Sequence, residues 1–169
     1  MSWYQTHRAN PGYRKTGFLS YNHQLMAPVE TRLRVRYAET DQMGVVYHAN
    51  YLIWFEVGRV ELMRALGIEY KRMELDDDCH IVVVDVRCRY INSARYDEEL
   101  CIRTRIAESR NRTIRFSYEI RRDSGQELLA VGETLHVICG SNGKPKLLPE
   151  KYRVILGTAP VSNPLGSRS

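Results

Sequence analysis

The chain has 169 residues, enough for one domain with a substantial core, and its 43% hydrophobic and 27% charged residues are those of an ordinary globular protein. Charged residues interrupt every apolar run before it reaches the length of a membrane span, which argues against a transmembrane segment. The net charge of +5 resides in residues 1–36, and the rest of the chain is neutral. Because a dense basic cluster is missing, we expect no nucleic-acid partner, although a contact of the basic N-terminal segment with nucleic acid or acidic lipid stays open.

Residues 1–27 show no sustained period and lack the compact apolar region of a secretory signal, which predicts an irregular leader. Residues 157–169 are small, polar and proline-containing, which indicates a flexible tail, so one domain is expected over residues 28–156. The chain has four cysteines without a CxxC pair or metal-ligand spacing: Cys79, Cys88, Cys101 and Cys139. We expect reduced thiols in a cytoplasmic protein.

Residues 29–37 alternate between apolar and charged side chains, as in a half-buried strand whose inner face ends at Tyr37. A short polar turn follows, and then an apolar helix from Leu52 to Leu66. Asn50 is the expected N-cap, and Gly67 stands where a left-handed residue would end the helix. Since its circumference is apolar nearly all round, the helix is predicted to be buried on most sides, with another backbone close to Gly58.

Residues 68–78 form a polar connection with room for a short helix, and their Asp76-Asp77-Asp78 run is expected to be a solvated loop and not a cation site. Four strands are expected next, over residues 80–90, 99–107, 112–122 and 126–139, with a bend or bulge at Gly132. A short helical piece should reach about Leu156. Strands in direct succession predict an antiparallel meander, so the fold class is α+β: about five antiparallel strands in one sheet curled around one long central helix.

The polar turn carries Asp41 and His48 directly before the predicted helix. The N-terminus of a helix has unpaired N–H groups and a partial positive charge, which suits stabilisation of a developing oxyanion. A carboxylate beside such a site can attack a carbonyl carbon or deprotonate a water molecule that attacks it. The sequence leaves both routes open.

The segment Tyr37-x-x-Thr-Asp-x-x-Gly-Val-Val-Tyr-His-Ala-Asn-Tyr51, with Trp54-Phe-Glu56, Arg59 and Ala94-Arg-Tyr-Asp-Glu-Glu-Leu100, closely resembles the hot-dog-fold acyl-CoA thioesterases. The similarity covers roughly residues 29–150 and is greatest to the branch related to 4-hydroxybenzoyl-CoA thioesterase and the thioesterase encoded beside the Tol–Pal genes. The resemblance implies hydrolysis of an acyl-CoA without metal or cofactor. It also implies a homo-oligomer, a dimer of dimers or homotetramer, with active sites between protomers.

The resemblance implies Asp41 as the catalytic carboxylate and the His48 N–H as the donor to the thioester oxygen, with the His48 side chain and Tyr37 in orienting roles. The residues expected at the substrate are Gly44, Val46, Tyr47 and Arg95, and the basic residues Lys144 and Lys146 are expected near the CoA phosphates.

Each assignment has a structural alternative. Asp41 can close an Asx-turn, His48 can be an ordinary helix-start residue, and Tyr37 can be a core aromatic. Glu56 and Glu61 lie on the helix where other hot-dog thioesterases carry their acid, but Glu56 is expected to pair with Arg59. Arg95 can pair with Asp97, and His80 and His136 are expected to be ordinary strand residues.

A second class of function remains open from the sequence: a non-catalytic hot-dog protein that holds an acyl chain or docks on a partner. The intact Asp41 in its turn favours the enzyme. A hot-dog dehydratase is disfavoured, because its Asp/His arrangement on the helix is absent from this sequence.

Overall fold

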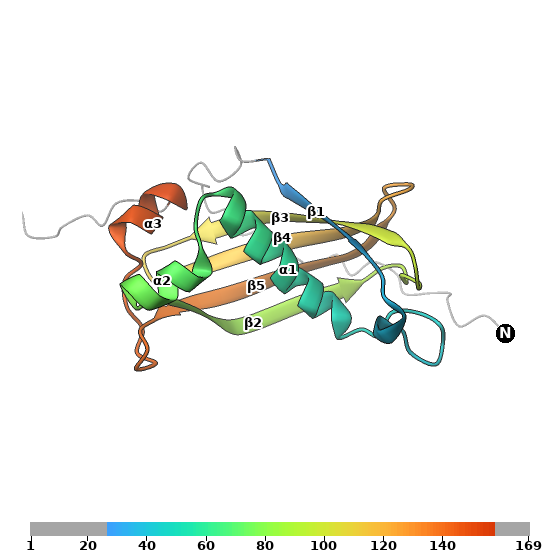
Figure 1. Cartoon of the computed structure of the whole chain (residues 1–169), viewed down its shortest axis with the longest axis horizontal. Coiled ribbons are helices and arrows are strands. Elements are labelled where there is room, and N and C mark those ends of the chain that lie inside the picture. Colours follow the sequence, from blue (N-terminus) through green and yellow to red (C-terminus); the bar gives the residue numbers. More distant parts are fainter. Residues whose placement is uncertain (1–26, 158–169) are drawn as a thin grey trace, which may run out of the picture.

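The computed structural model describes residues 27–157 and consists of one sheet with a long helix across one face (Figure 1). The predicted leader and tail lie outside the described residues, apart from residues 27 and 157. The strands are β1 (Val29–Arg34), β2 (His80–Tyr90), β3 (Glu99–Ser109), β4 (Thr113–Arg122) and β5 (Leu128–Cys139). The helices are the 3-10 turn η2 (Tyr37–Glu39), α1 (Asn50–Ala65), α2 (Tyr70–Asp77) and α3 (Glu150–Ile155). The α+β class, the five antiparallel strands and the central helix are therefore confirmed.

The strand order is β1-β3-β4-β5-β2, and every neighbouring pair is antiparallel. The predicted meander holds for β3, β4 and β5, but β2 lies at the sheet edge beside β5. Residues 91–98 carry the chain back across the end of the sheet, where the Ile91 N–H donates to Leu129 O and the Val35 N–H donates to Glu98 O. This crossover leaves β1 and β2 as the two edges.

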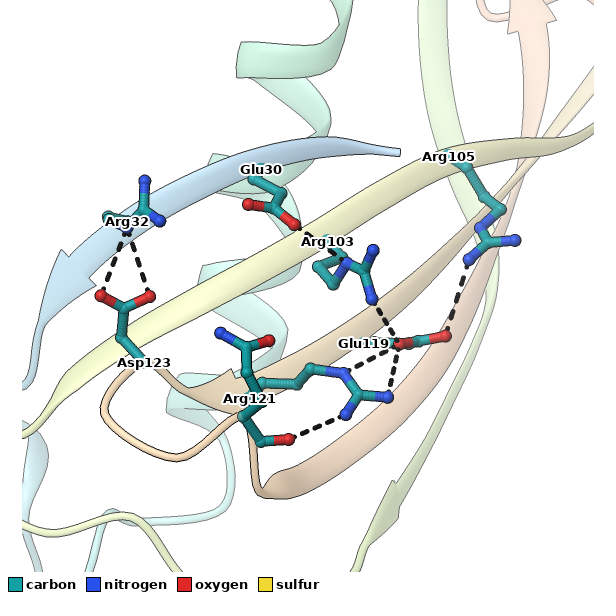
Figure 2. Close-up of polar contacts among 8 residues, drawn as sticks. Glu30, Arg32, Arg103, Arg105, Glu119, Arg121 and Asp123 are labelled. Carbon is teal, nitrogen blue, oxygen red and sulfur yellow. Dashed lines mark hydrogen bonds and ion pairs between the residues drawn. The ribbon is translucent and has the colours of Figure 1, made fainter. Parts of the chain in front are cut away.

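The inner faces of β3 and β4 follow the predicted alternation. Leu100, Ile102, Thr104, Ile106, Ile114, Phe116, Tyr118 and Ile120 are all buried. The outer face is charged: Arg103, Arg105 and Arg121 converge on Glu119 (Figure 2). On β1, Arg32 pairs with Asp123. The basic residues of the first strand are therefore largely paired within the molecule.

Helix α1 begins two residues earlier than predicted, and Asn50 is not its N-cap. Ala49 occupies the cap position with a helical backbone, while Asn50 Nδ2 donates to Glu39 O at 2.8 Å. The C-terminal prediction is confirmed, because Gly67 has φ +76° and its N–H donates to Arg64 O. The polar side chain at the helix start thus holds the preceding turn and not the helix end.

The prediction that α1 is buried on most sides is wrong for the single chain. Its sheet-facing side packs on β1, β3 and β4 and buries Tyr51, Trp54, Phe55, Leu62 and Met63. Leu52, Ile53 and Val57 on its other sides remain exposed. One open sheet covers only one side of a helix, so the other apolar residues stay available for contacts outside this chain.

Gly58 lies in the contact between α1 and β3. A Cβ there would come within 2.4 Å of Thr104 Oγ1 and 2.9 Å of Ile102 Cγ2. The predicted close approach is thus real, but it involves side chains of β3 instead of a second backbone.

Gly132 does not form the predicted bend or bulge, since the register runs unbroken through its pairs with Cys88 and Tyr118. Its missing side chain leaves room for the Phe55 ring, which stacks on the Tyr118 ring with centroids 4.4 Å apart. A Cβ at Gly132 would lie 2.4 Å from that ring and 2.7 Å from the Arg87 carbonyl oxygen.

We therefore expect Gly132→Ala to lower the free energy of unfolding by about 2–3 kcal/mol, because neither the buried ring nor the backbone carbonyl can move away freely. Chemical denaturation measures the change. Gly125→Ala is the matched control, since a Cβ there meets nothing within 4 Å and should change little. Equal stability of both variants would contradict this packing.

The Asp76-Asp77-Asp78 run is not the expected solvated loop, because Asp76 and Asp77 end helix α2 and Asp78 is its C-cap. Asp77 Oδ2 accepts a hydrogen bond from the Tyr152 hydroxyl at 2.6 Å and pairs with Lys151 at 2.7 Å. Asp78 Oδ1 accepts the Ser141 N–H at 2.7 Å. These carboxylates are therefore structural partners, and residues 27–157 hold no cluster of His, Cys, Asp and Glu suited to a metal ion.

Candidate active site

The turn before α1 is built on the buried carboxylate of Glu39. It accepts hydrogen bonds from the Arg36 N–H at 2.8 Å, from Arg36 Nη2 at 2.9 Å and from Trp54 Nε1 at 3.1 Å. Burial by itself would raise the pKa of Glu39, but these bonds, led by those of Arg36, hold it below its ordinary value. The charged carboxylate thus anchors the turn to the first two turns of α1.

The backbone of Glu39 completes this attachment. Its carbonyl oxygen accepts the Tyr47 N–H at 2.9 Å in addition to the Asn50 side chain. Thr40 and Val46 form an isolated antiparallel bridge that closes the loop between them. The loop that carries Asp41 is therefore fixed at both ends relative to the start of α1.

Asp41 lies at the start of this loop and is partly exposed. Its Oδ1 accepts the Met43 N–H at 2.8 Å, which is the Asx-turn that the sequence allowed, and Gly44 follows with φ +71°. The second carboxylate oxygen has no hydrogen-bond partner among the described residues. One oxygen thus fixes the side chain in the turn, while the other makes no hydrogen bond within residues 27–157.

His48 lies at the N-terminal end of α1 with an exposed side chain beside the rings of Tyr47 and Tyr90. Within residues 27–157, the backbone N–H groups of His48 and Ala49 have no acceptor. The Tyr90 hydroxyl donates to His48 O at 3.0 Å. Desolvation of this hydroxyl raises the pKa of Tyr90 to about 12, and the hydroxyl is protonated at neutral pH, as an ordinary tyrosine also is, so it acts as a donor.

The planar peptide links these observations. The His48 carbonyl and the Ala49 N–H belong to one trans peptide and point in opposite directions. By holding the His48 carbonyl, Tyr90 fixes the direction of the free Ala49 N–H. The arrangement is a pre-oriented donor site of the kind that stabilises an oxyanion.

A cavity of about 250 Å³ brings these groups together. Its lining consists of Asp41, Met43, Val45, Val46, His48, Tyr51, Tyr90, Ile91, Asn92 and Ser93. Three of the residues expected in the site, Asp41, Val46 and His48, share this cavity. The other four, Tyr37, Gly44, Tyr47 and Arg95, do not line it.

Tyr37 is neither on the β1 face nor in the core. The chain leaves the sheet after Val35 and forms η2, so the Tyr37 side chain is 77% exposed and packs edge-on against Tyr96 with ring centroids 5.7 Å apart. The alternation that placed it on the strand stops two residues before it. Both the strand-face expectation and the core-aromatic alternative are wrong.

Arg95 lies behind the loop of Asp41. Its Nη1 is 3.4 Å from Gly44 O, and its N–H donates to Glu98 Oε2. The alternative pairing with Asp97 is wrong, because Asp97 pairs with Arg34.

Lys146 lies far from Arg95 in the same chain. It contacts Asp78 beside the start of β2, whereas the cavity lies at the end of β2 marked by Tyr90. Eleven residues of strand separate these ends by roughly 33 Å. The expectation that Arg95 and Lys146 meet at one set of phosphates therefore fails within a single chain.

Several residues that shape the site had no signal in the sequence. Glu39 belongs to no motif that marks a buried carboxylate, and Tyr90 reads as an ordinary strand residue. Tyr51, whose hydroxyl accepts the Ala94 N–H at 3.2 Å, joins the helix start to the segment after β2. The expected Glu56–Arg59 ion pair does not form within the described chain; Arg59 Nη1 lies instead 3.5 Å from His136 Nε2.

Known proteins that are similar to this chain include thioesterases and thioesterase-like proteins. A model of the thioesterase-like superfamily matches residues 35–156. YneP of Bacillus subtilis is 40% identical over 107 residues, which make up 63% of this chain and 75% of YneP. The acyl-CoA thioesterase YbgC of Haemophilus influenzae is 33% identical over 114 residues, 68% of this chain and 82% of YbgC. The crystal structure of a DHNA-CoA thioesterase from Staphylococcus aureus matches with a TM-score of 0.74 and 31% identity, over 78% of this chain and 90% of that one.

The fold and the site therefore define a hot-dog protein. The chain belongs to the thioesterase-like superfamily, and the resemblance seen in the sequence is confirmed. No helix in residues 27–157 is long and apolar enough to cross a membrane.

Proposed function

We propose that the protein is an acyl-CoA thioesterase, which hydrolyses a thioester to a free acid and CoA. One observation carries the proposal: Asp41 and His48, the residue at the N-terminal end of α1, line the same cavity. A carboxylate beside pre-oriented N–H donors is the minimal equipment for acyl transfer to water. The names of YbgC and the DHNA-CoA thioesterase support the same chemistry.

The thioester oxygen would accept the N–H of His48, beside the Ala49 N–H that Tyr90 orients, at the positive end of α1 as negative charge develops. Asp41 would then act in one of two ways. It attacks the carbonyl carbon and expels the CoA thiolate, leaving an anhydride that water cleaves, or it takes the proton of a water molecule that attacks. Both routes end in the same products, and both require the charged carboxylate.

The remaining site residues would hold the substrate around this centre. Val46 provides an apolar wall of the cavity, and Gly44 allows the left-handed turn that presents Asp41. Tyr47 lies exposed beside His48, at the rim. We retain Tyr37 only as an exposed residue of the same loop, since its packing on Tyr96 does not support an orienting role.

We further propose a dimer built on β2, and a dimer of dimers above it, in the cytoplasm. Strand β2 is a free sheet edge with four exposed valines, Val82, Val83, Val84 and Val86, whereas the opposite edge β1 carries charged residues. Free apolar edges pair with other strands. The four cysteines are free thiols, as suits a reducing compartment. Residues 28–156 would form the catalytic domain.

Antiparallel pairing of two β2 strands would also bring together the basic residues expected at the CoA phosphates, which lie far apart in a single chain. It places the His80 end of one copy beside the Tyr90 end of the other. Lys144 and Lys146 of a second copy would then lie near Arg95 and the Asp41 loop of the first. The CoA phosphates would be held between protomers.

Arg95→Ala tests the phosphate site. If Arg95 contacts the nucleotide, this variant should raise KM for acyl-CoA by about 10-fold while changing KM little for the corresponding pantetheine thioester, which lacks the nucleotide phosphates. Steady-state kinetics on both substrates provide the measurement. Equal effects on both would assign Arg95 to its Gly44 contact and withdraw the binding role.

The alternative is a protein that binds acyl groups without turnover. A panel of acyl-CoAs, followed by release of the free thiol, separates the two and also maps acyl preference. Catalytic thiol release from any member supports the enzyme, whereas saturable binding across the panel without thiol release would favour the binding protein.

A further inference from the structure

A buried polar cluster lies on the inner face of the sheet, beyond the cavity of Asp41. His136 on β5 is completely buried, and its Nε2 lies 2.8 Å from Thr134 Oγ1 and 3.5 Å from Arg59 Nη1. The Tyr118 hydroxyl lies 2.8 Å from the same Thr134 oxygen. Tyr70, from α2, adds a buried hydroxyl without a hydrogen-bond partner among the described residues.

Arg59 is the only cation of this cluster, and its neighbours are neutral. Burial, followed by the Arg59 charge, lowers the pKa of His136 to about 4, and burial raises the pKa of Tyr70 to about 12. In the described part of the chain, no carboxylate lies within ion-pair distance of Arg59, and its Nε is buried without a partner. A partly buried guanidinium with only neutral neighbours is costly unless an anion joins it.

The cluster lies at one end of a strip of exposed surface between α1 and β2, and the other end of this strip is the cavity of Asp41. Leu52, Glu56 and Arg59 are spaced i, i+4 and i+7 and share the flank of α1 that faces β5. On the sheet, Tyr90, Val86 and Val83 pair with inner-face positions of β5 and remain exposed, because α1 packs on the other half of the sheet. Val83 pairs with His136, and Tyr90 lines the cavity of Asp41.

The dimensions of this strip suit an acyl group. From the start of α1 at Asn50 to Arg59 the helix rises about 14 Å. An acyl group whose thioester oxygen accepts the His48 N–H would therefore run along Leu52 and Glu56, over apolar strand residues, and end at Arg59. Leu52 and the strand valines make the first part of this path apolar, Glu56 adds a carboxylate beside it, and its far end is cationic.

We propose that Arg59 is a specificity-determining residue, which binds a carboxylate at the distal end of the acyl group. The inference rests on the proposed thioesterase function and adds its substrate class, acyl-CoAs that carry a terminal carboxylate. The guanidinium presents several N–H donors in a fixed fork that matches a carboxylate. His136, which is neutral and is held by Thr134, contacts the guanidinium without neutralising it.

The test compares two series of acyl-CoAs of matched chain length, one ending in a methyl group and one in a carboxylate. For the wild-type protein, kcat/KM should be higher in the carboxylate series at the length that reaches Arg59. In Arg59→Met, which keeps an unbranched apolar stem, kcat/KM for that carboxylate substrate should fall by about 10- to 100-fold, as expected for a lost charged hydrogen bond. Values for the methyl series should remain within about threefold.

Two controls decide between specificity and structure. Arg64→Met changes the same residue type on the same helix, where Arg64 pairs with Glu61, and should alter neither series. Arg59→Lys keeps the charge without the fork and should recover part of the preference.

The outcomes are distinct. An equal loss in both series for Arg59→Met, or a wild-type protein without preference for the carboxylate series, overturns the role of Arg59 while leaving the thioesterase intact. Hydrolysis of neither series by the wild-type protein would overturn the proposed function and this inference with it. Should Arg59→Met fail to fold, the wild-type preference and Arg59→Lys still decide.

Discussion

Replacing Asp41 with Asn is expected to lower kcat for acyl-CoA hydrolysis by roughly 10²–10⁴-fold, equivalent to about 3–5 kcal/mol of transition-state stabilisation. The amide keeps the size of the carboxylate and an oxygen that can accept the Met43 N–H, so the Asx-turn should persist. It loses the charge that either route requires, as nucleophile or as general base. KM should change little, because the cavity keeps its shape.

Steady-state turnover and chemical denaturation of the same preparations measure both halves of this expectation. Asp76→Asn is the matched control, since Asp76 is exposed on α2, away from the cavity, and should leave turnover unchanged. Turnover by Asp41→Asn at the wild-type rate would remove Asp41 from the chemistry. Loss of stability together with activity would instead assign the carboxylate a structural role in its turn.

Placing two lysines on the free edge of β2 should have the second largest effect. In the double variant Val82→Lys, Val84→Lys, like charges would meet across a two-fold axis, and we expect the dimer dissociation constant to rise by at least about 100-fold. Activity should fall in parallel if Lys144 and Lys146 of one copy bind the CoA phosphates of a substrate held in the cavity of the other. Light scattering and turnover, both measured against protein concentration, test this.

Val154→Lys provides the comparison for that variant, because Val154 is an exposed valine on α3, outside the proposed interface. It should retain the assembly and the activity of the wild-type protein. A wild-type protein that is monomeric at micromolar concentration and fully active would contradict the shared site.

Local alternation was sufficient to predict most of the sheet. Strands β3 and β4 are buried on one face and charged on the other, so a period of two identifies both the strand and its inner face. The place of β2 was not predictable in this way, because strand order depends on a crossover and not on residues within the strand. The burial of α1 was overestimated for a related reason: an apolar circumference does not tell which partner covers it.

In the site, too, features set by neighbouring residues were predictable and features set by distant contacts were not. Asp41, Gly44 and His48 follow one another in a loop, so the sequence alone could predict a turn that feeds a helix. Glu39 and Tyr90 act through hydrogen bonds to Trp54 and His48, which lie 15 and 42 residues away along the chain, and no local pattern reports such contacts. Tyr37 was misplaced because the strand ends earlier than its alternation suggests.

Arg59 shows how a local rule can mislead. An i, i+3 spacing to Glu56 favours an ion pair on an isolated helix by only a few tenths of a kcal/mol. In the folded chain the guanidinium instead turns toward His136 on β5, a contact across 77 residues. Tertiary packing, and not the weak local preference, therefore determines the position of this side chain.

The most direct test of the proposed thioesterase is to follow free thiol and free acid together after mixing the purified protein with an excess of acyl-CoA. Both products should accumulate in equal amounts and well beyond one per protomer, since Asp41 and the start of α1 would act repeatedly on the thioester. Acyl-CoA that binds and can be recovered intact, without thiol or acid in solution, would contradict the account and identify the cavity as a binding site.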